Sequence, residues 1–358
     1  MHRAVHAVLA AAVLVALALP ASASAAPPAG FVGMTADDLY GNGGPYRDKA
    51  LAQQKAAGIQ LLRVTFNWSL IEIAPNNFDF STYDRYVLDA AQNNISFPPV
   101  LVDAPDFYSV KPGTRFAYQP RDNADMARFA LRVVDRYGPN GTLWQQNPLV
   151  TPHPITAWQI WNEPHLKQYW YKKPNPDQYR AMLETVGTAI KSRDPNAEIV
   201  TAGISDSFLK GAIRLTPFLK ALYKNGGTNL FDTLAINSYA VSPKYLNKLL
   251  TRTRKLVNRL GGRSDKLWIT EVGWCDKGVK HRFCVGKKRQ TKYTGQALSL
   301  IKKKRRAWKL RGFVWFSWRD GKPYVRGQDF WGNHTGLLTI PGKKKPAYKA
   351  FVKGVKRF

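Results

Sequence analysis

The sequence predicts a single α/β domain: a closed barrel of eight parallel strands, each followed by a helix, known as the (β/α)8 or TIM barrel. Eight short runs rich in β-branched and aromatic residues alternate with longer amphipathic runs along the chain. No linker, second domain or short repeat interrupts residues 27–358. About 330 residues suit one barrel better than two domains of average size.

The first 26 residues have the pattern of a secretory signal peptide. A basic start at His2 and Arg3 precedes an apolar run from Ala7 to Leu19, and small residues in A-x-A spacing follow. The apolar run is too short for a membrane span of about 20 residues, and no later stretch approaches that length. We therefore expect a secreted, extracellular protein with a signal peptide at 1–26, one domain at 27–358 and no transmembrane segment.

The predicted strands are the short runs dominated by β-branched, aliphatic and aromatic side chains. In order, they cover residues 31–34, 59–66, 97–103, 155–161, 197–203, 231–239, 266–274 and 312–318.

The predicted helices lie between these strands and carry apolar residues near positions i, i+3, i+4 and i+7. They cover residues 46–58, 81–94, 123–138, 176–193, 216–227, 244–262 and 291–310, with a closing helix at 346–358. Several end in Gly or Asn, as helix C-termini favour. Strands and helices in strict alternation predict a closed parallel barrel rather than an open sheet.

Two cysteines, Cys275 and Cys284, lie close together in the chain. In an oxidising compartment such a pair predicts a local disulfide. With only His281 nearby, the pair falls short of the four ligands of a structural zinc site. We expect neither a metal nor another cofactor.

The chain is strongly basic, with 54 Lys and Arg against 24 Asp and Glu and a net charge of +30. The basic residues cluster at 286–289, 302–306, 342–349 and 353–358. One interpretation is a solvated basic exterior; the other is a site for anionic glycans or cell-envelope polymers, since such a field attracts polyanions. Nucleic acid is the least supported partner, because export removes it and no recognition motif is visible. We expect a monomer.

Two glutamates fall at the ends of predicted strands. Glu163, in "WQIWNEP", ends the fourth strand, and Glu271, in "WITEVGW", ends the seventh. Active sites of such barrels gather at the C-terminal ends of the strands, and a facing pair of carboxyl groups is what cleavage of a glycosidic bond requires. Singly, Glu163 could cap the turn that begins at Pro164 and Glu271 could pair with a strand-end arginine. Two glutamates in these sequence motifs, at the ends of the fourth and seventh predicted strands, favour a catalytic role.

These two motifs resemble those of the clan A glycoside hydrolases, cellulase-like retaining enzymes of the family 5 type or a close relative such as family 39. Residues 61–105 resemble the second and third βα units of the clan, and residues 336–351 resemble its cellulase-like ending. The resemblance implies that Glu163 is the acid/base and Glu271 the nucleophile of a double displacement on a poly- or oligosaccharide.

The resemblance also implies roles for three polar residues. Arg63 matches the arginine that orients the nucleophile, Asn162 the asparagine that binds the sugar 2-hydroxyl, and Tyr239 the tyrosine that donates to the nucleophile. The structural alternatives are an ion pair at the barrel mouth for Arg63 and a packed rim aromatic for Tyr239.

Three tryptophans are candidates for the sugar site. Trp315 and Trp318 compete for the strand-eight tryptophan that floors it, and Trp68 is either a further wall or a core residue. The chain departs from many cellulase-type members, which carry one histidine after strand three and another two residues before the strand-six tyrosine. Here those places hold "LVDAPDFY" and Asn237, and Asp103 or Asn237 could supply substitute contacts.

Three functions remain open. The first is a secreted retaining β-glycosidase. The second is a non-catalytic barrel that binds carbohydrate or envelope polymers through its basic surface. The third is a transglycosylase, which shares the covalent intermediate with the hydrolase. The sequence does not name the sugar.

Overall fold

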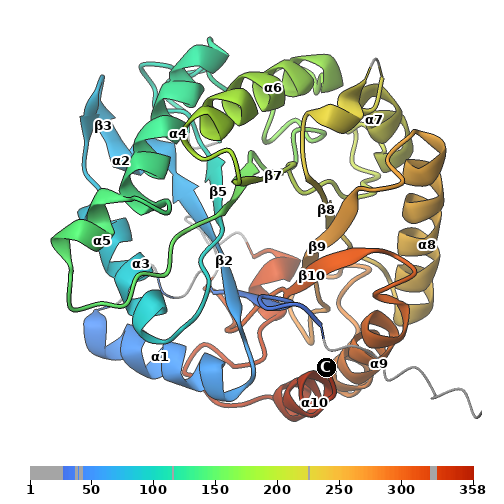
Figure 1. The fold of residues 1–358 in the computed structure, drawn as a ribbon. Coiled ribbons are helices and arrows are strands. Elements are labelled where there is room, and N and C mark those ends of the chain that lie inside the picture. Colours follow the sequence, from blue (N-terminus) through green and yellow to red (C-terminus); the bar gives the residue numbers. More distant parts are fainter. Residues whose placement is uncertain (1–26, 37–38, 40–42, 115–116, 225, 323–328) are drawn as a thin grey trace, which may run out of the picture.

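The computed structural model describes residues 27–36, 39, 43–114, 117–224, 226–322 and 329–358. Eight parallel strands form a closed barrel (Figure 1). They are β1 (Val32–Thr35), β2 (Leu61–Asn67), β5 (Pro99–Val102), β6 (Ala157–Ile160), β7 (Glu198–Val200), β8 (Thr233–Asn237), β9 (Lys266–Val272) and β10 (Leu310–Trp315).

Helices surround the strands on the outside of the barrel (Figure 1). They are α1 (Gly44–Ala56), α3 (Ser81–Gln92), α4 (Asn123–Tyr137), α6 (Pro176–Arg193), α7 (Leu215–Leu222), α8 (Pro243–Arg259), α9 (Lys287–Lys304) and α10 (Pro346–Val355). Shorter elements lie in the connections: α2 (Trp68–Ile71), a hairpin of β3 (Glu72–Ala74) and β4 (Asn77–Phe78), α5 (Thr142–Gln146), and the 3-10 turns η2 (Gly227–Asn229) and η3 (Trp331–His334).

The barrel closes where β1 pairs with both β2 and β10, with Gly33 aligned to Leu61 on one side and to Val314 on the other. Alternation along each strand divides the apolar side chains into two cores. The outer core lies between strands and helices. The inner cluster fills the barrel with one residue from each of six strands: Leu61, Ala157, Val200, Ala235, Trp268 and Val314.

The predicted architecture is confirmed. Each of the eight predicted strands overlaps an observed one, and the predicted helix at 176–193 has the observed bounds. The elements α2, β3, β4 and α5 were not predicted, because each is only two to five residues long and too short to show a period. The predicted signal peptide lies outside the described residues. No helix of the described part is long and apolar enough to cross a membrane.

Candidate active site

A layer of polar side chains lies above the inner cluster, at the C-terminal ends of the strands. Arg63 follows Leu61 by two residues on β2, and Gln159 follows Ala157 by two on β6, so each pair shares a face of its strand. Asn237 stands in the same relation to Ala235 on β8. The alternation that fills the barrel with apolar side chains thus brings polar ones together at its mouth.

Glu271, near the end of β9, is held by two donors. Arg63 Nη1 donates to Glu271 Oε1 over 2.9 Å, and the Tyr239 hydroxyl donates to Oε2. Arg63 is buried, and Glu271 is 8 % exposed, so this ion pair is largely shielded from water. Charge-assisted hydrogen bonds to both oxygens fix the orientation of the carboxylate.

The rest of the Arg63 guanidinium is fixed by neighbours from β6. Its Nε donates to Gln159 Oε1 over 2.8 Å, and its Nη2 donates to Asn162 Oδ1 over 3.0 Å. The planar fork of an arginine allows these bonds in fixed relative directions. Arg63 therefore ties Glu271 to the segment that carries Glu163.

Glu163 lies just beyond β6 in a left-handed backbone conformation, with φ of 45°. Its N–H donates to the carbonyl of Gly203 over 3.2 Å. Gly203 has no room for a side chain, because a Cβ there would lie 2.3 Å from Asn237 Oδ1. This close approach brings Asn237 against the backbone that anchors Glu163.

The two glutamates have different environments. Burial raises the pKa of Glu163 to about 7, and the nearby charge of Glu271 adds to the increase. The nearby polar side chains of Ser205 and Asn237 oppose this increase in the pKa of Glu163. Near neutral pH, Glu163 can therefore hold a proton beside a carboxylate that Arg63 and Tyr239 engage.

His165 and Ser205 form a buried polar pair next to Glu163. His165 Nε2 lies 3.0 Å from Ser205 Oγ, and both residues are buried. Burial lowers the pKa of His165 to about 3, so its ring is neutral at ordinary pH. His165 Nδ1 has no partner among the described residues, and an unpartnered acceptor is less costly here than an unpartnered N–H. We infer that His165 donates from Nε2 to Ser205, which leaves the serine hydroxyl to donate to Glu163.

Aromatic rings line one side of the mouth around Tyr239. The ring centre of Tyr239 lies 4.6 Å from that of Trp331, 5.7 Å from Phe283 and 5.9 Å from Phe316. Phe283 belongs to the loop closed by Cys275 and Cys284, where the predicted disulfide is confirmed. The disulfide loop thus places an aromatic ring beside the tyrosine that contacts Glu271.

The three predicted sugar-site tryptophans require correction, because all are buried in the outer core. Trp315 packs against Phe351 of α10, with ring centres 5.7 Å apart. Trp318 packs against Tyr348 of the same helix at 5.8 Å. The residue that reaches the mouth is Phe316, which directly follows β10 and lies two positions after the inward-facing Val314.

Trp68 is likewise a core residue rather than a wall. Its indole N–H donates to the buried Glu72 Oε2 over 2.6 Å. Its ring stacks between Phe129 at 5.2 Å and Tyr108 at 5.6 Å. No face of this indole remains for a sugar.

Asn237 occupies the place where many cellulase-type members carry histidine. Its Oδ1 accepts a bond of 2.8 Å from Thr270 Oγ1, and its Nδ2 has no hydrogen-bond partner among the described residues. The side chain is fully buried, and its amide acts on Glu163 by lowering the pKa. Asp103 bonds instead to Ser69. Among the described residues, no group of three or more His, Cys, Asp or Glu is placed to hold a metal ion.

Sequence reasoning missed Ser205, His165, Gln159, Phe283, Phe316 and Trp331. For Phe316 and Gln159 a signal was present, since both lie in phase with inward-facing strand residues. Ser205 and Phe283 lie in loops, and Trp331 begins the short 3-10 turn η3; such segments have no period that shows which side chains meet.

Solved structures of clan A glycoside hydrolases from families 39, 5 and 10 share the closed (β/α)8 barrel of this chain. One is a family 39 glycoside hydrolase from Bacteroides cellulosilyticus WH2, with a TM-score of 0.66 and 17 % identity over 90 % of this chain and 63 % of that one. Another is a monomeric β-xylosidase from Caulobacter crescentus CB15, with a TM-score of 0.65 and 16 % identity over 92 % and 69 % of the two chains.

A third similar structure is xylanase 10B from Thermotoga maritima, with a TM-score of 0.60 and 14 % identity over 92 % of this chain and 95 % of that one. The resemblance to the clan is thus confirmed for the fold. This chain spans less than two thirds of the family 39 structure. No protein-family model and no curated protein matches the sequence.

Proposed function

We propose that this protein is an exported glycoside hydrolase that cleaves β-linked O-glycosidic bonds of a poly- or oligosaccharide with retention of configuration. The observation that carries the proposal is the pair of unequal carboxyl groups. Glu271 is engaged by Arg63 and Tyr239, whereas burial raises the pKa of Glu163 to about 7. Two titratable groups with divergent environments are the mark of an acid and a nucleophile.

In the first step, a Glu271 oxygen attacks the anomeric carbon while Glu163 gives its proton to the glycosidic oxygen. The bond to the leaving alcohol breaks, and a glycosyl ester forms on Glu271. The ester carries no charge, so the repulsion that raised the pKa of Glu163 falls. Glu163 then takes a proton from water, whose oxygen attacks the anomeric carbon and releases Glu271 as a carboxylate.

The surrounding residues have positioning and binding roles in this proposal. Arg63 and Tyr239 aim the Glu271 carboxylate through bonds to its two oxygens. Asn162 directs its Oδ1 to Arg63, which leaves its amide N–H groups for a sugar hydroxyl. Phe316, Trp331 and Phe283 offer apolar ring surface beside Tyr239 for the C–H groups of a sugar.

The test is a screen of aryl β-glycosides with the mature protein. The similar structures include a β-xylosidase, a xylanase, a glucosidase and an exo-β-1,4-mannosidase, so β-xylosides, β-glucosides and β-mannosides are tested first. We expect proton NMR to show the β anomer of the released sugar first, before mutarotation. The α anomer as first product would rule out the double displacement, and no turnover on any glycoside would favour the non-catalytic alternative.

The pH profile should report the environment of Glu163. Because Glu163 must be protonated in the first step, kcat/KM should fall on the alkaline side around pH 7. Ser205 lowers the pKa of Glu163, so Ser205→Ala should move this limb to higher pH by about 0.5 to 1 pH unit, the equivalent of one hydrogen bond. The measurement is kcat/KM against pH on a glycoside with a poor leaving group.

Ser205→Thr is the matched control, because it keeps the hydroxyl. Its alkaline limb should stay close to that of the unmodified protein. An unchanged limb in Ser205→Ala, or one moved to lower pH, would contradict the donor role of Ser205. A loss of activity without any movement of the limb would indicate a merely structural role.

A further inference from the structure

Three neighbouring helices form a basic face on the outside of the barrel. The helices α8, α9 and α10 hold six, seven and two lysine or arginine residues, and no aspartate or glutamate. They lie next to one another along one side of the barrel (Figure 1). Lysine and arginine residues of the three helices are thus concentrated on one surface of the protein.

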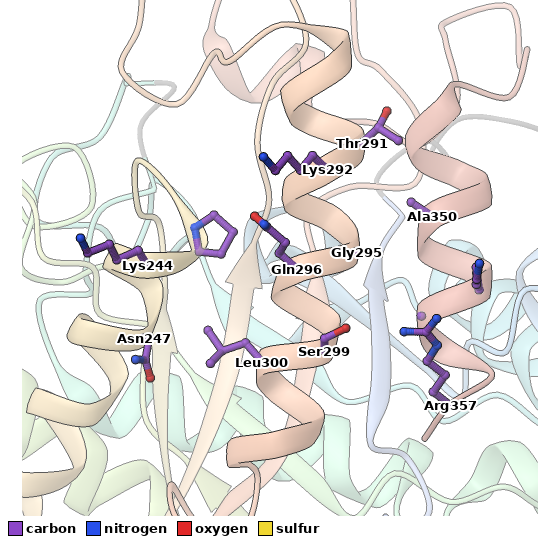
Figure 2. A pocket seen from close by; sticks show the side chains of 13 residues that line it. Lys244, Asn247, Thr291, Lys292, Gly295, Gln296, Ser299, Leu300, Ala350 and Arg357 are labelled. Atoms are coloured by element: carbon purple, nitrogen blue, oxygen red, sulfur yellow. The ribbon is translucent and has the colours of Figure 1, made fainter.

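This face is hollowed rather than flat. A groove of about 740 Å3 runs between the three helices, with α9 at its centre and Lys244 and Arg357 on opposite sides (Figure 2). Gly295, Ala350 and Gly354 keep it open with small side chains. At Gly354 a Cβ would lie 2.4 Å from Leu298, so α10 packs close to α9 there.

Two further hollows extend the groove and share residues with it. One, of about 420 Å3, continues from Asn247 along α8. The other, of about 390 Å3, continues from Ser299 toward the C-terminal end of α9. No acidic residue lines any of the three hollows. Twelve basic residues line them together: Lys244, Lys248, Arg252, Lys255, Arg259, Lys292, Lys302, Lys303, Arg305, Arg306, Lys353 and Arg357.

Four cations of the groove have no ion-pair partner among the described residues. Lys244, Lys292, Lys353 and Arg357 are exposed and form no ion pair in the described part of the chain. Arg252 differs, because it pairs with Asp206. The five carboxylates after residue 243 are engaged elsewhere: Asp265 with Tyr223, Glu271 with Arg63, Asp276 and Asp320 with Lys345, and Asp329 with His334.

We propose that this groove binds a linear anionic polysaccharide, whose charges are carboxylates or phosphodiesters. A polymer fits better than a small anion, because the lining cations of α9 extend from Lys292 to Lys303, about 17 Å at 1.5 Å per residue. Each exposed cation contributes little alone, so binding requires many of them at once. No aromatic side chain lines the three hollows, so they lack the stacking platforms typical of single-stranded nucleic-acid sites.

The groove also begins on the side of the barrel that carries the glutamates. Pro243 and Lys244 open α8, which follows β8 and the segment with Tyr239. In a (β/α)8 barrel the C-terminal ends of the strands and the starts of the following helices share one face. A glycan chain held in the groove is therefore anchored near the mouth. Binding in the groove does not require the proposed hydrolysis.

The experiment compares two fourfold variants of the mature protein with equal loss of charge. The groove variant is Lys244→Gln, Lys292→Gln, Lys353→Gln and Arg357→Gln. The control removes four exposed cations from α1, α3 and α7 and the turn that follows it: Lys49→Gln, Arg85→Gln, Lys220→Gln and Lys224→Gln. Binding is measured by calorimetry with alginate as the carboxylate polymer, a teichoic acid as the phosphodiester polymer, and dextran as the neutral polymer.

We expect the unmodified protein to bind at least one anionic polymer and not dextran, and to lose affinity at least about tenfold between about 50 mM and about 300 mM salt. The groove variant should bind at least about tenfold more weakly, and the control less than about twofold. Binding of alginate would identify carboxylates as the recognised charges, and binding of the teichoic acid would identify phosphodiesters. Thermal melts check that both variants fold.

Equal weakening in the two variants would overturn the groove and assign the effect to the field of the whole protein. Absence of binding to both anionic polymers would overturn the proposal, as would tighter binding of an oligothymidylate than of either polymer. Turnover of a neutral aryl glycoside is measured in parallel. If that turnover is absent while the groove binds, the proposed hydrolase fails and the groove stands.

Discussion

In the proposed double displacement, replacement of Glu271 with glutamine should abolish turnover of every glycoside, by at least about 10⁴-fold in kcat, because an amide side chain cannot form the glycosyl ester. The amide keeps the size of the side chain and can still contact Arg63 and Tyr239, but the buried Arg63 loses its counter-charge, so a thermal melt must show that the variant is folded. Glu184→Gln, on the exposed face of α6, is the matched control and should keep full activity.

Glu163→Ala should behave differently, because in the proposed mechanism it removes the proton donor rather than the nucleophile. Substrates with poor leaving groups should lose about 10² to 10⁴-fold, whereas dinitrophenyl glycosides should still form the glycosyl ester. Azide needs no general base, so it should restore turnover and yield a β-glycosyl azide. An equal loss on all leaving groups, without rescue by azide, would remove Glu163 from the acid/base role.

The barrel and the pair of glutamates could be predicted because each depends on local pattern and one general rule. Eight alternating runs imply eight βα units, and the ends of parallel strands meet at one face. Glu163 and Glu271 needed no further information to be placed at the same mouth.

The aromatic surface could not be predicted, because it depends on the phase of β10. The pairing of β10 with β9 shifts register between Phe313 and Trp315. Whether Trp315, Phe316 or Trp318 reaches the mouth follows from where the strand begins and ends, and a shift of one residue exchanges the faces. Tryptophan was the residue that the resemblance suggested, and phenylalanine is the residue that the geometry selects.

The polar neighbours of Glu163 could not be predicted from the sequence for a different reason. His165 and Ser205 come from separate loops, and their contact joins residues forty positions apart. Neither residue belongs to a periodic segment. The neutral state of His165 results from burial, which is a property of the whole fold.

The basic run at residues 343–345 also could not be interpreted from the sequence alone, because its three lysines have different surroundings in the fold. Lys343 and Lys344 are exposed, whereas Lys345 is 5 % exposed. Lys345 Nζ donates to Asp276 Oδ1 over 2.8 Å and to Asp320 Oδ1 over 2.7 Å. This buried cluster joins the segment after β9, the segment after β10 and the start of α10.

Lys345→Met should therefore destabilise the protein by about 3 to 5 kcal/mol at neutral pH, since it leaves two buried carboxylates without their cation. Burial already raises the pKa of Asp320, with Lys345 opposing the increase. Without Lys345 that pKa should rise further, so the native state would bind more protons than the unfolded state at intermediate pH. The stability of the variant should then recover as pH falls toward the unfolded pKa and decline as pH rises.

The measurement is the free energy of unfolding in urea at several pH values, for Lys345→Met and for Lys343→Met as the exposed control. The control should change by less than about 0.5 kcal/mol. Addition of Asp276→Asn and Asp320→Asn to Lys345→Met should restore part of the loss, because neutral amides remove the uncompensated charge. Equal effects of the two lysine variants would show that Lys345 acts only as part of the basic exterior. Because Asp276 directly follows Cys275, a large effect would instead tie the stability of the barrel to the loop that holds Phe283 at the mouth.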